Sequence, residues 1–87
     1  MYDYPLDPYW STEEIIDVVS LYNAVEKAYE EGISQDEFMK YYRRFTEIVN
    51  SKSEQKRIDE EFYKVSGYSI YKVFQQSKEH DWIEIKW

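Results

Sequence analysis

The pattern Ser-x-x-Glu occurs three times in this chain, and each occurrence predicts the start of a helix. In a capping box, the Ser hydroxyl accepts a hydrogen bond from the backbone N–H three residues later, and the carboxylate at that position accepts one from the Ser N–H. Two glycines are placed to end the first and third helices, because glycine adopts the left-handed conformation of a residue after a helix without steric cost. The predicted caps are Ser11 with Glu14, Ser34 with Glu37, Ser51 with Glu54, Ser69 for a fourth helix, and the stops Gly32 and Gly67.

These boundaries predict an all-α fold, a small bundle of three long helices and a shorter fourth. Apolar residues repeat at helical spacing within each segment, and 87 residues are enough for one domain around a single core. Connections of about three residues favour roughly antiparallel successive helices. The expected elements are an extended N-terminal arm (1–10), helices 12–31, 35–49, 52–66 and 70–80, and a short extended C-terminal tail (82–87).

The composition excludes several classes of protein. There is no Cys, so neither disulfides nor thiolate chemistry can contribute. The first residues lack the basic and apolar regions of a signal peptide, and no apolar run approaches the roughly 18 residues of a membrane span. We therefore expect a cytoplasmic protein without membrane association.

The net charge of −7 is concentrated in the first third of the chain. Residues 1–31 contain eight acidic residues against Lys27 alone, whereas the later segments are neutral. An acidic face disfavours binding to nucleic acid, since phosphate binding depends on Lys and Arg. Two interpretations remain open: the charge provides solubility and pairs with bases on neighbouring helices, or it recognises a basic partner, including by mimicry of nucleic acid.

Two groups of apolar residues exceed what a bundle core requires. The first helix has a wider apolar stripe than a helix covering one side of a core needs, so part of it could face another protomer. The last six residues alternate in polarity like a strand, which predicts either a tail lying across its own bundle or a peptide that pairs with another chain. The candidate interaction residues are Ile16, Leu21, Trp82, Ile83, Ile85 and Trp87.

No residue group has the spacing that a known catalytic chemistry demands. His80 is the single histidine, so a zinc site cannot be completed from histidines, and no glycine-rich phosphate loop is present. We predict no catalytic residues, no metal site and no cofactor. Glu26 is the exception to consider, because it falls on the apolar arc of the first helix. It is a candidate buried carboxylate, held by a structural hydrogen bond or facing a ligand.

Several segments together resemble the YktA-like uncharacterised protein family of Gram-positive bacteria. They are Tyr4-Pro5-Leu6, Trp10 to Glu14, Val25 to Glu30, the stretch from Arg44-Phe45 to Ile48-Val49, Ser51-Lys52 with Glu54 and Lys56, and Ser66 to Ser69 with Tyr71 and Val73. The resemblance covers roughly Tyr4 to Ser77 and implies a small, mostly helical cytoplasmic protein. It brings no established activity and no functional residues. Asn50 stands where the family pattern suggests Pro.

The leading functional hypothesis is a non-enzymatic protein–protein interaction module, whose partner is an unidentified protein or a second copy of the chain. Regulation of a basic protein by nucleic-acid mimicry is the alternative. A small enzyme with a carboxylate site near Glu26 is a third possibility, which a concave pocket enclosing that residue would favour.

Overall fold

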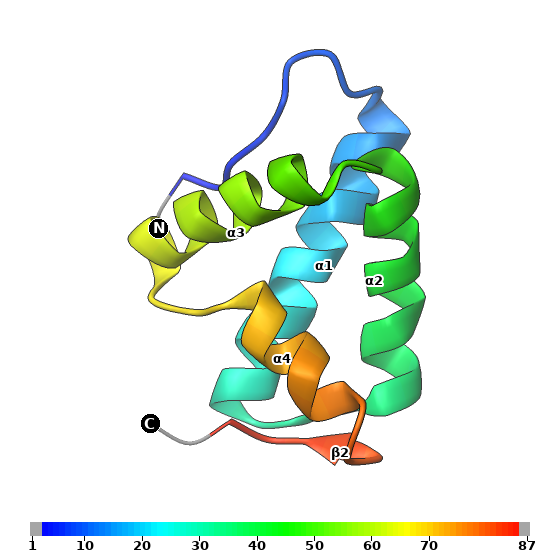
Figure 1. Ribbon diagram of the computed structural model, residues 1–87, viewed down its shortest axis with the longest axis vertical. Coiled ribbons are helices and arrows are strands. Elements are labelled where there is room, and N and C mark those ends of the chain that lie inside the picture. Colours follow the sequence, from blue (N-terminus) through cyan, green and yellow to red (C-terminus); the bar gives the residue numbers. More distant parts are fainter. Residues whose placement is uncertain (1–2, 86–87) are drawn as a thin grey trace.

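The computed structural model describes residues 3–85 and confirms a small, mostly helical fold (Figure 1). Two very short strands accompany the four helices. In chain order the elements are α1 (Thr12–Glu30), β1 (Ile33–Ser34), α2 (Gln35–Ile48), α3 (Lys52–Ser66), α4 (Ile70–Ser77) and β2 (Trp82–Ile83).

The helices α1 and α2 lie side by side, while α3 runs across one end of this pair (Figure 1). The expectation that all successive helices are antiparallel is therefore wrong for α3. This helix has only two fully covered positions, Ile58 and Phe62, and the Phe62 ring stacks on Tyr22 of α1 with 4.7 Å between centroids. A helix with so narrow an apolar stripe can cross the bundle, because it has little surface to bury along its length.

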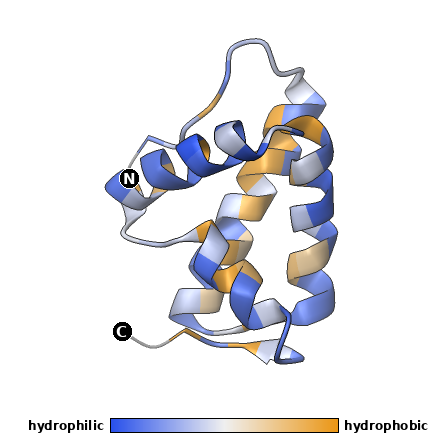
Figure 2. Ribbon diagram, viewed as in Figure 1, coloured by the Kyte–Doolittle hydropathy of each residue, from blue (hydrophilic) through white to orange (hydrophobic). Residues whose placement is uncertain are grey.

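The core lies around α1, which contributes seven buried residues. In Figure 2, apolar positions are frequent along α1, whereas α3 is mostly hydrophilic. Four aromatic rings extend the core between α2 and α4: Tyr42 stacks on Phe74 with centroids 4.3 Å apart and also lies near Phe38 and Phe45.

The predicted caps differ in their hydrogen bonds. Ser11 and Glu14 form the complete capping box, with distances of 3.1 and 2.8 Å. The Ser34 and Ser69 hydroxyls accept from the backbone N–H groups of Glu37 and Lys72. Glu37 does not complete a box, and its carboxylate lies 3.5 Å from the Lys27 ammonium.

The predicted capping box at Ser51 is wrong. This side chain caps no backbone N–H of α3, and its hydroxyl instead lies 2.9 Å from that of Ser53. Glu54 is drawn away from the helix start because its carboxylate binds the Arg57 guanidinium three residues later. The guanidinium donates to both oxygens of this carboxylate, whereas the Ser51 N–H could donate to only one.

Residues 82–85, the described part of the C-terminal tail, pack on their own chain. β2 pairs antiparallel with β1, with Ile33 opposite Ile83 and Ser34 opposite Trp82. The backbone N–H of Ile85 then donates to the carbonyl of Ala28 in α1. The predicted helix 70–80 ends earlier, at Ser77, because the chain must turn before residue 81, whose carbonyl accepts from the N–H of Gln35 at 2.7 Å.

Both glycines have positive φ angles, +99° at Gly32 and +79° at Gly67, as expected for residues that end helices. Gly32 has a second constraint. A β-carbon placed there would lie 2.6 Å from the Trp82 indole nitrogen, so the absence of a side chain lets the tail approach the end of α1.

The caps give a matched prediction. Ser11→Ala removes a hydroxyl that satisfies the first turn of α1 and should lower the free energy of unfolding by about 1 kcal/mol. Ser51→Ala removes a hydroxyl that caps nothing, and we expect little change. Urea unfolding followed by circular dichroism measures both variants; equal losses would show that Ser51 caps α3 in solution.

Gly32→Ala should cost more stability than Gly67→Ala. Both substitutions strain a left-handed backbone by about 1 kcal/mol, but only Gly32 would also bring a methyl group against the Trp82 indole. In a Trp82→Ala background the excess cost of Gly32→Ala should largely disappear, as a double-mutant cycle of thermal unfolding would report. An excess that survives removal of the indole would contradict this contact.

Candidate interaction surface

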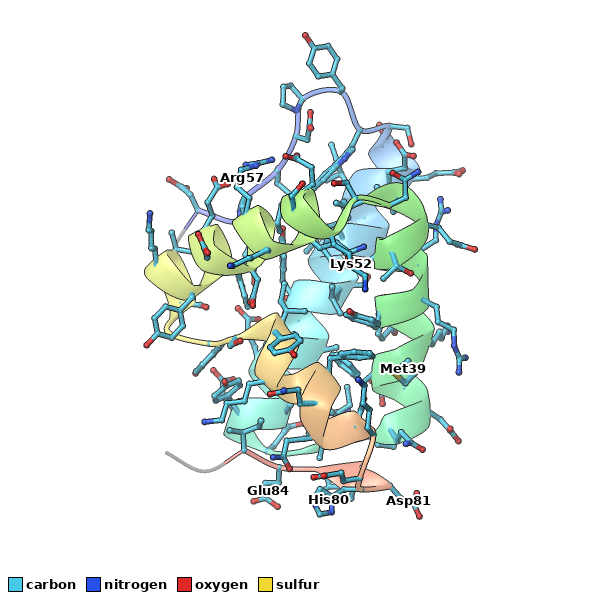
Figure 3. The ribbon with its side chains drawn as sticks, in the orientation of Figure 1. Met39, Lys52, Arg57, His80, Asp81 and Glu84 are labelled. Carbon is cyan, nitrogen blue, oxygen red and sulfur yellow. The ribbon has the colours of Figure 1, made fainter. Side chains whose placement is uncertain are left out.

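His80 lies on the surface of the protein. It is exposed in the turn after α4 and lies with Asp81 and Glu84 at the edge of the molecule (Figure 3). Within residues 3–85, no group of three or more His, Asp or Glu side chains could hold a metal ion. Over the same range, no helix is both long and apolar enough to cross a membrane.

Glu26 is partly buried rather than buried, so the prediction of a core carboxylate is corrected. Its Oε2 accepts a hydrogen bond from the Tyr4 hydroxyl at 2.9 Å. The same Tyr4 hydroxyl lies 3.1 Å from Oδ1 of Asn23. Neither of the two hollows described below is lined by Glu26. This carboxylate helps to hold the N-terminal arm on α1.

Asp59 has a structural role that the sequence did not reveal. Although it belongs to α3, its carboxylate accepts from the first N–H groups of α4, at 2.7 Å from Ile70 and 3.4 Å from Tyr71, and from the Ser69 hydroxyl at 3.3 Å. Burial raises the pKa of the Asp59 carboxyl above its ordinary value, although the N–H donors of Ile70 and Tyr71 oppose the shift. Asp59, a residue of α3, therefore caps the N-terminus of α4.

The candidate interaction residues fall into two groups. Leu21, Ile83 and Ile85 are wrong as contact residues for another chain, since they are 0%, 1% and 6% exposed within this one. All three side chains belong to the hydrophobic core. Ile16 and Trp82 are more than half exposed, and Trp87 lies outside the described residues.

The N-terminal arm is fixed to α1 and α3 by aromatic side chains. The Tyr22 hydroxyl donates to the Pro5 carbonyl at 2.6 Å, and the Tyr4 ring packs 5.1 Å from Tyr22 and 6.1 Å from Phe62, measured between centroids. Burial raises the pKa of the Tyr22 phenol far above its ordinary value, and the nearby Glu61 carboxylate adds to this shift. Tyr4 and Pro5 thus attach the described part of the arm to α1 and α3.

The arm ends in a β-turn that presents an aromatic side chain to solvent. The Trp10 N–H donates to the carbonyl of Asp7 at 3.1 Å, and the Asp7 side chain accepts from the N–H of Tyr9 at 2.8 Å. Pro8, at the second position, presets the backbone of the turn. Tyr9 is 94% exposed on this constrained backbone.

Two shallow hollows lie beside this turn, where the arm meets α3. The larger, about 210 Å³, is lined by arm residues and by Arg57, Ile58 and Glu61, and the smaller, about 150 Å³, by the α2–α3 connection and Glu54. They share Asp7, Trp10 and Ile58. We call the turn–α3 surface the set formed by Leu6, Asp7, Pro8, Tyr9, Trp10, Glu54, Arg57, Ile58 and Glu61.

Arg57 is the cation of this surface, and two carboxylates already hold it. Its Nε and Nη2 donate to Glu54 at 3.3 and 2.8 Å, and its Nη1 donates to Glu61. The hydrogen bond to Glu54 is the main cause that raises the pKa of the Arg57 guanidinium above its ordinary value. This arrangement leaves the surface with an excess of negative charge.

The turn–α3 surface was not among the sequence-based candidates, although a local signal was present. Asp followed by Pro is a favoured start of a β-turn, which places the next residue at an exposed position. The contribution of Ile58 and Arg57 depends on how α3 crosses the bundle, which no local pattern specifies.

The fold and this surface define a small helical protein with an aromatic, acidic surface at one end. The chain belongs to the uncharacterised protein family UPF0223, whose model matches residues 1–86. The family resemblance inferred from the sequence is confirmed, including its occurrence in Gram-positive bacteria.

Its relatives are proteins of similar length. A UPF0223 protein of Bacillus mycoides (strain KBAB4) is 55% identical over 78 residues, which cover 90% of this chain and 88% of the relative. A UPF0223 protein of Streptococcus uberis is 53% identical over 78 residues, covering 90% and 85%. One from Staphylococcus aureus (strain Newman) is 49% identical over 79 residues, covering 91% and 87%.

Tyr22→Phe tests the attachment of the arm and its pH dependence. Loss of the bond to the Pro5 carbonyl should lower the free energy of unfolding by about 1 kcal/mol at pH 8. Because folding raises the pKa of Tyr22, the folded state holds this proton more tightly than the unfolded chain does. Stability should therefore fall as the pH rises above the unfolded pKa of about 10.

Urea unfolding at pH 8 and pH 11 measures this loss. Tyr22→Phe should make the loss between the two pH values smaller, whereas Tyr9→Phe, which changes a ring that is 94% exposed, is the control and should leave it unchanged. An identical loss in the wild-type chain and in Tyr22→Phe would contradict the buried phenol.

Proposed function

We propose that this chain is a non-enzymatic, cytoplasmic protein–protein interaction module that binds through the turn–α3 surface. The observation that carries the proposal is Tyr9, an aromatic side chain that is 94% exposed on a backbone fixed by Asp7 and Pro8. Burying such a ring in a partner costs little conformational entropy, and tyrosine is enriched among the residues that dominate interface energetics.

The size of the hollows supports a protein partner over a small molecule. At about 210 and 150 Å³, both are smaller than the 300 to 1,000 Å³ typical of sites that enclose a drug-sized ligand or cofactor. Volumes of this size suit single side chains of a partner.

The chemistry of the described residues favours binding over catalysis. Glu26 and Asp59 are both partly buried, and each carboxylate accepts hydrogen bonds that hold the fold together. A structural role therefore accounts for both carboxylates without a substrate.

Site-specific photo-crosslinking in cells tests the proposal. A benzophenone amino acid at position 9 should give a defined adduct with another protein or with a second copy of the chain, identified by mass spectrometry. The same group at position 71, a tyrosine of α4 that is 58% exposed, provides the matched control and should not give that adduct. The adduct partner should also copurify with the wild-type chain and not with Tyr9→Ala.

The absence of any adduct at position 9 would contradict binding through this surface. A second copy in the adduct would identify a homodimer, which analytical ultracentrifugation of the wild-type chain and Tyr9→Ala would then have to show as a shift from dimer to monomer.

A further inference from the structure

We infer that the partner of the turn–α3 surface is an extended protein segment that carries Lys or Arg together with one apolar side chain. This inference rests on the proposed interaction function and adds the chemical class of the partner. It depends on three features of the surface: its charge, its apolar hollow and the position of Tyr9.

The charge of the surface favours a cationic partner. Asp7, Glu54 and Glu61 supply three carboxylates against the single guanidinium of Arg57. Arg57 already donates to Glu54 and Glu61, so an anionic ligand would have to displace one of them. In addition, no Lys or Arg occurs between Asp3 and Glu26, so the neighbouring first turn of α1 adds only negative charge.

The larger hollow can accommodate an apolar side chain of the partner. Leu6, Pro8, Trp10 and Ile58 line the larger one, whose volume of about 210 Å³ accommodates a side chain such as Leu or Phe. A Lys or Arg next to that residue in an extended segment would lie near the rim, where Glu54 and Glu61 are about half exposed. An exposed ring such as Tyr9 can pack on the aliphatic part of a Lys or stack on an Arg guanidinium.

The N-terminus of α3 favours an anionic partner instead of a cationic one. The first turn of α3, which Ser51 does not cap, borders the smaller hollow, and a helix N-terminus favours negative charge. Its effect equals about half a charge and falls off within one turn. The excess negative charge of the carboxylates therefore outweighs the dipole at the N-terminus of α3. Binding of an acidic partner would overturn the inference.

Selection from an unbiased peptide library tests the inference. A phage library of random 12-residue peptides is panned against the full chain, and the selected sequences are compared with the unselected pool. We expect enrichment of Lys or Arg beside Leu, Ile or Phe. Selected peptides should shift the Trp10 indole signal and the amide signals of residues 7, 9–11 and 51–61 in spectra of the 15N-labelled protein.

Three variants separate this binding mode from general adhesion to an acidic protein. Tyr9→Ala should weaken the selected peptides at least about tenfold, the scale of a dominant interface residue, whereas Tyr71→Ala should not change their affinity. Arg57→Gln should strengthen binding, because it removes the one cation of the surface. A variant that merely damaged the fold could not produce that gain.

The outcomes distinguish the two proposals. Acidic or uncharged selected peptides, affinities unaffected by Tyr9→Ala, or spectral changes confined to other parts of the chain would each overturn the inference about the partner. If cross-linking from position 9 still gave a defined adduct, the proposed interaction function would stand. If position 9 gave no adduct and the selected peptides bound elsewhere, both would fail.

Discussion

The hydrogen bond from the Tyr22 hydroxyl to the Pro5 carbonyl is the contact on which one end of this molecule depends. Tyr22 belongs to α1, its ring stacks on Phe62 of α3, and its hydroxyl holds the arm. One buried side chain therefore sets the position of three segments relative to one another. Because Pro5 comes just before the turn that begins at Asp7, the same bond fixes where Tyr9 enters the solvent. The position of the turn–α3 surface is therefore a consequence of core packing.

This 87-residue chain has no Cys, and residues 3–85 contain no group that could hold a metal ion. Aromatic rings explain how it nevertheless builds a sufficient core. A domain of this size buries a smaller fraction of its surface than a larger one, and each aromatic side chain removes 150 to 250 Å² from water. One cluster, around Tyr22, joins α1, α3 and the arm, and a second, around Tyr42, joins α2 and α4. Together the two clusters connect all four helices and the arm.

The sequence predicted the features that depend on neighbouring residues and missed those that depend on distant ones. The capping box at Ser11 closes within four residues, and all of its groups are visible in the pattern. The same pattern failed at Ser51, because Arg57, outside the box, competes for the Glu54 carboxylate. The alternation of apolar and polar residues in the tail correctly placed Ile83 and Ile85 on a different side from Trp82. This pattern does not indicate whether the same chain or another chain covers the apolar side. The turn–α3 surface requires the crossing of α3, which only tertiary packing decides.

The cap that Asp59 provides for α4 has a consequence for the order of folding. An isolated helix of eight residues is unstable in water, and here the groups that satisfy its first N–H donors come partly from a side chain eleven residues earlier, on another helix. α4 therefore gains its full stability only after α3 has packed in its final position. The tail pairs with Ile33 and Ser34 in the connection between α1 and α2, so its pairing requires that these two helices have formed. The last quarter of the chain is expected to be a late, dependent unit that opens first, so that its backbone amides exchange with solvent sooner than those of α1.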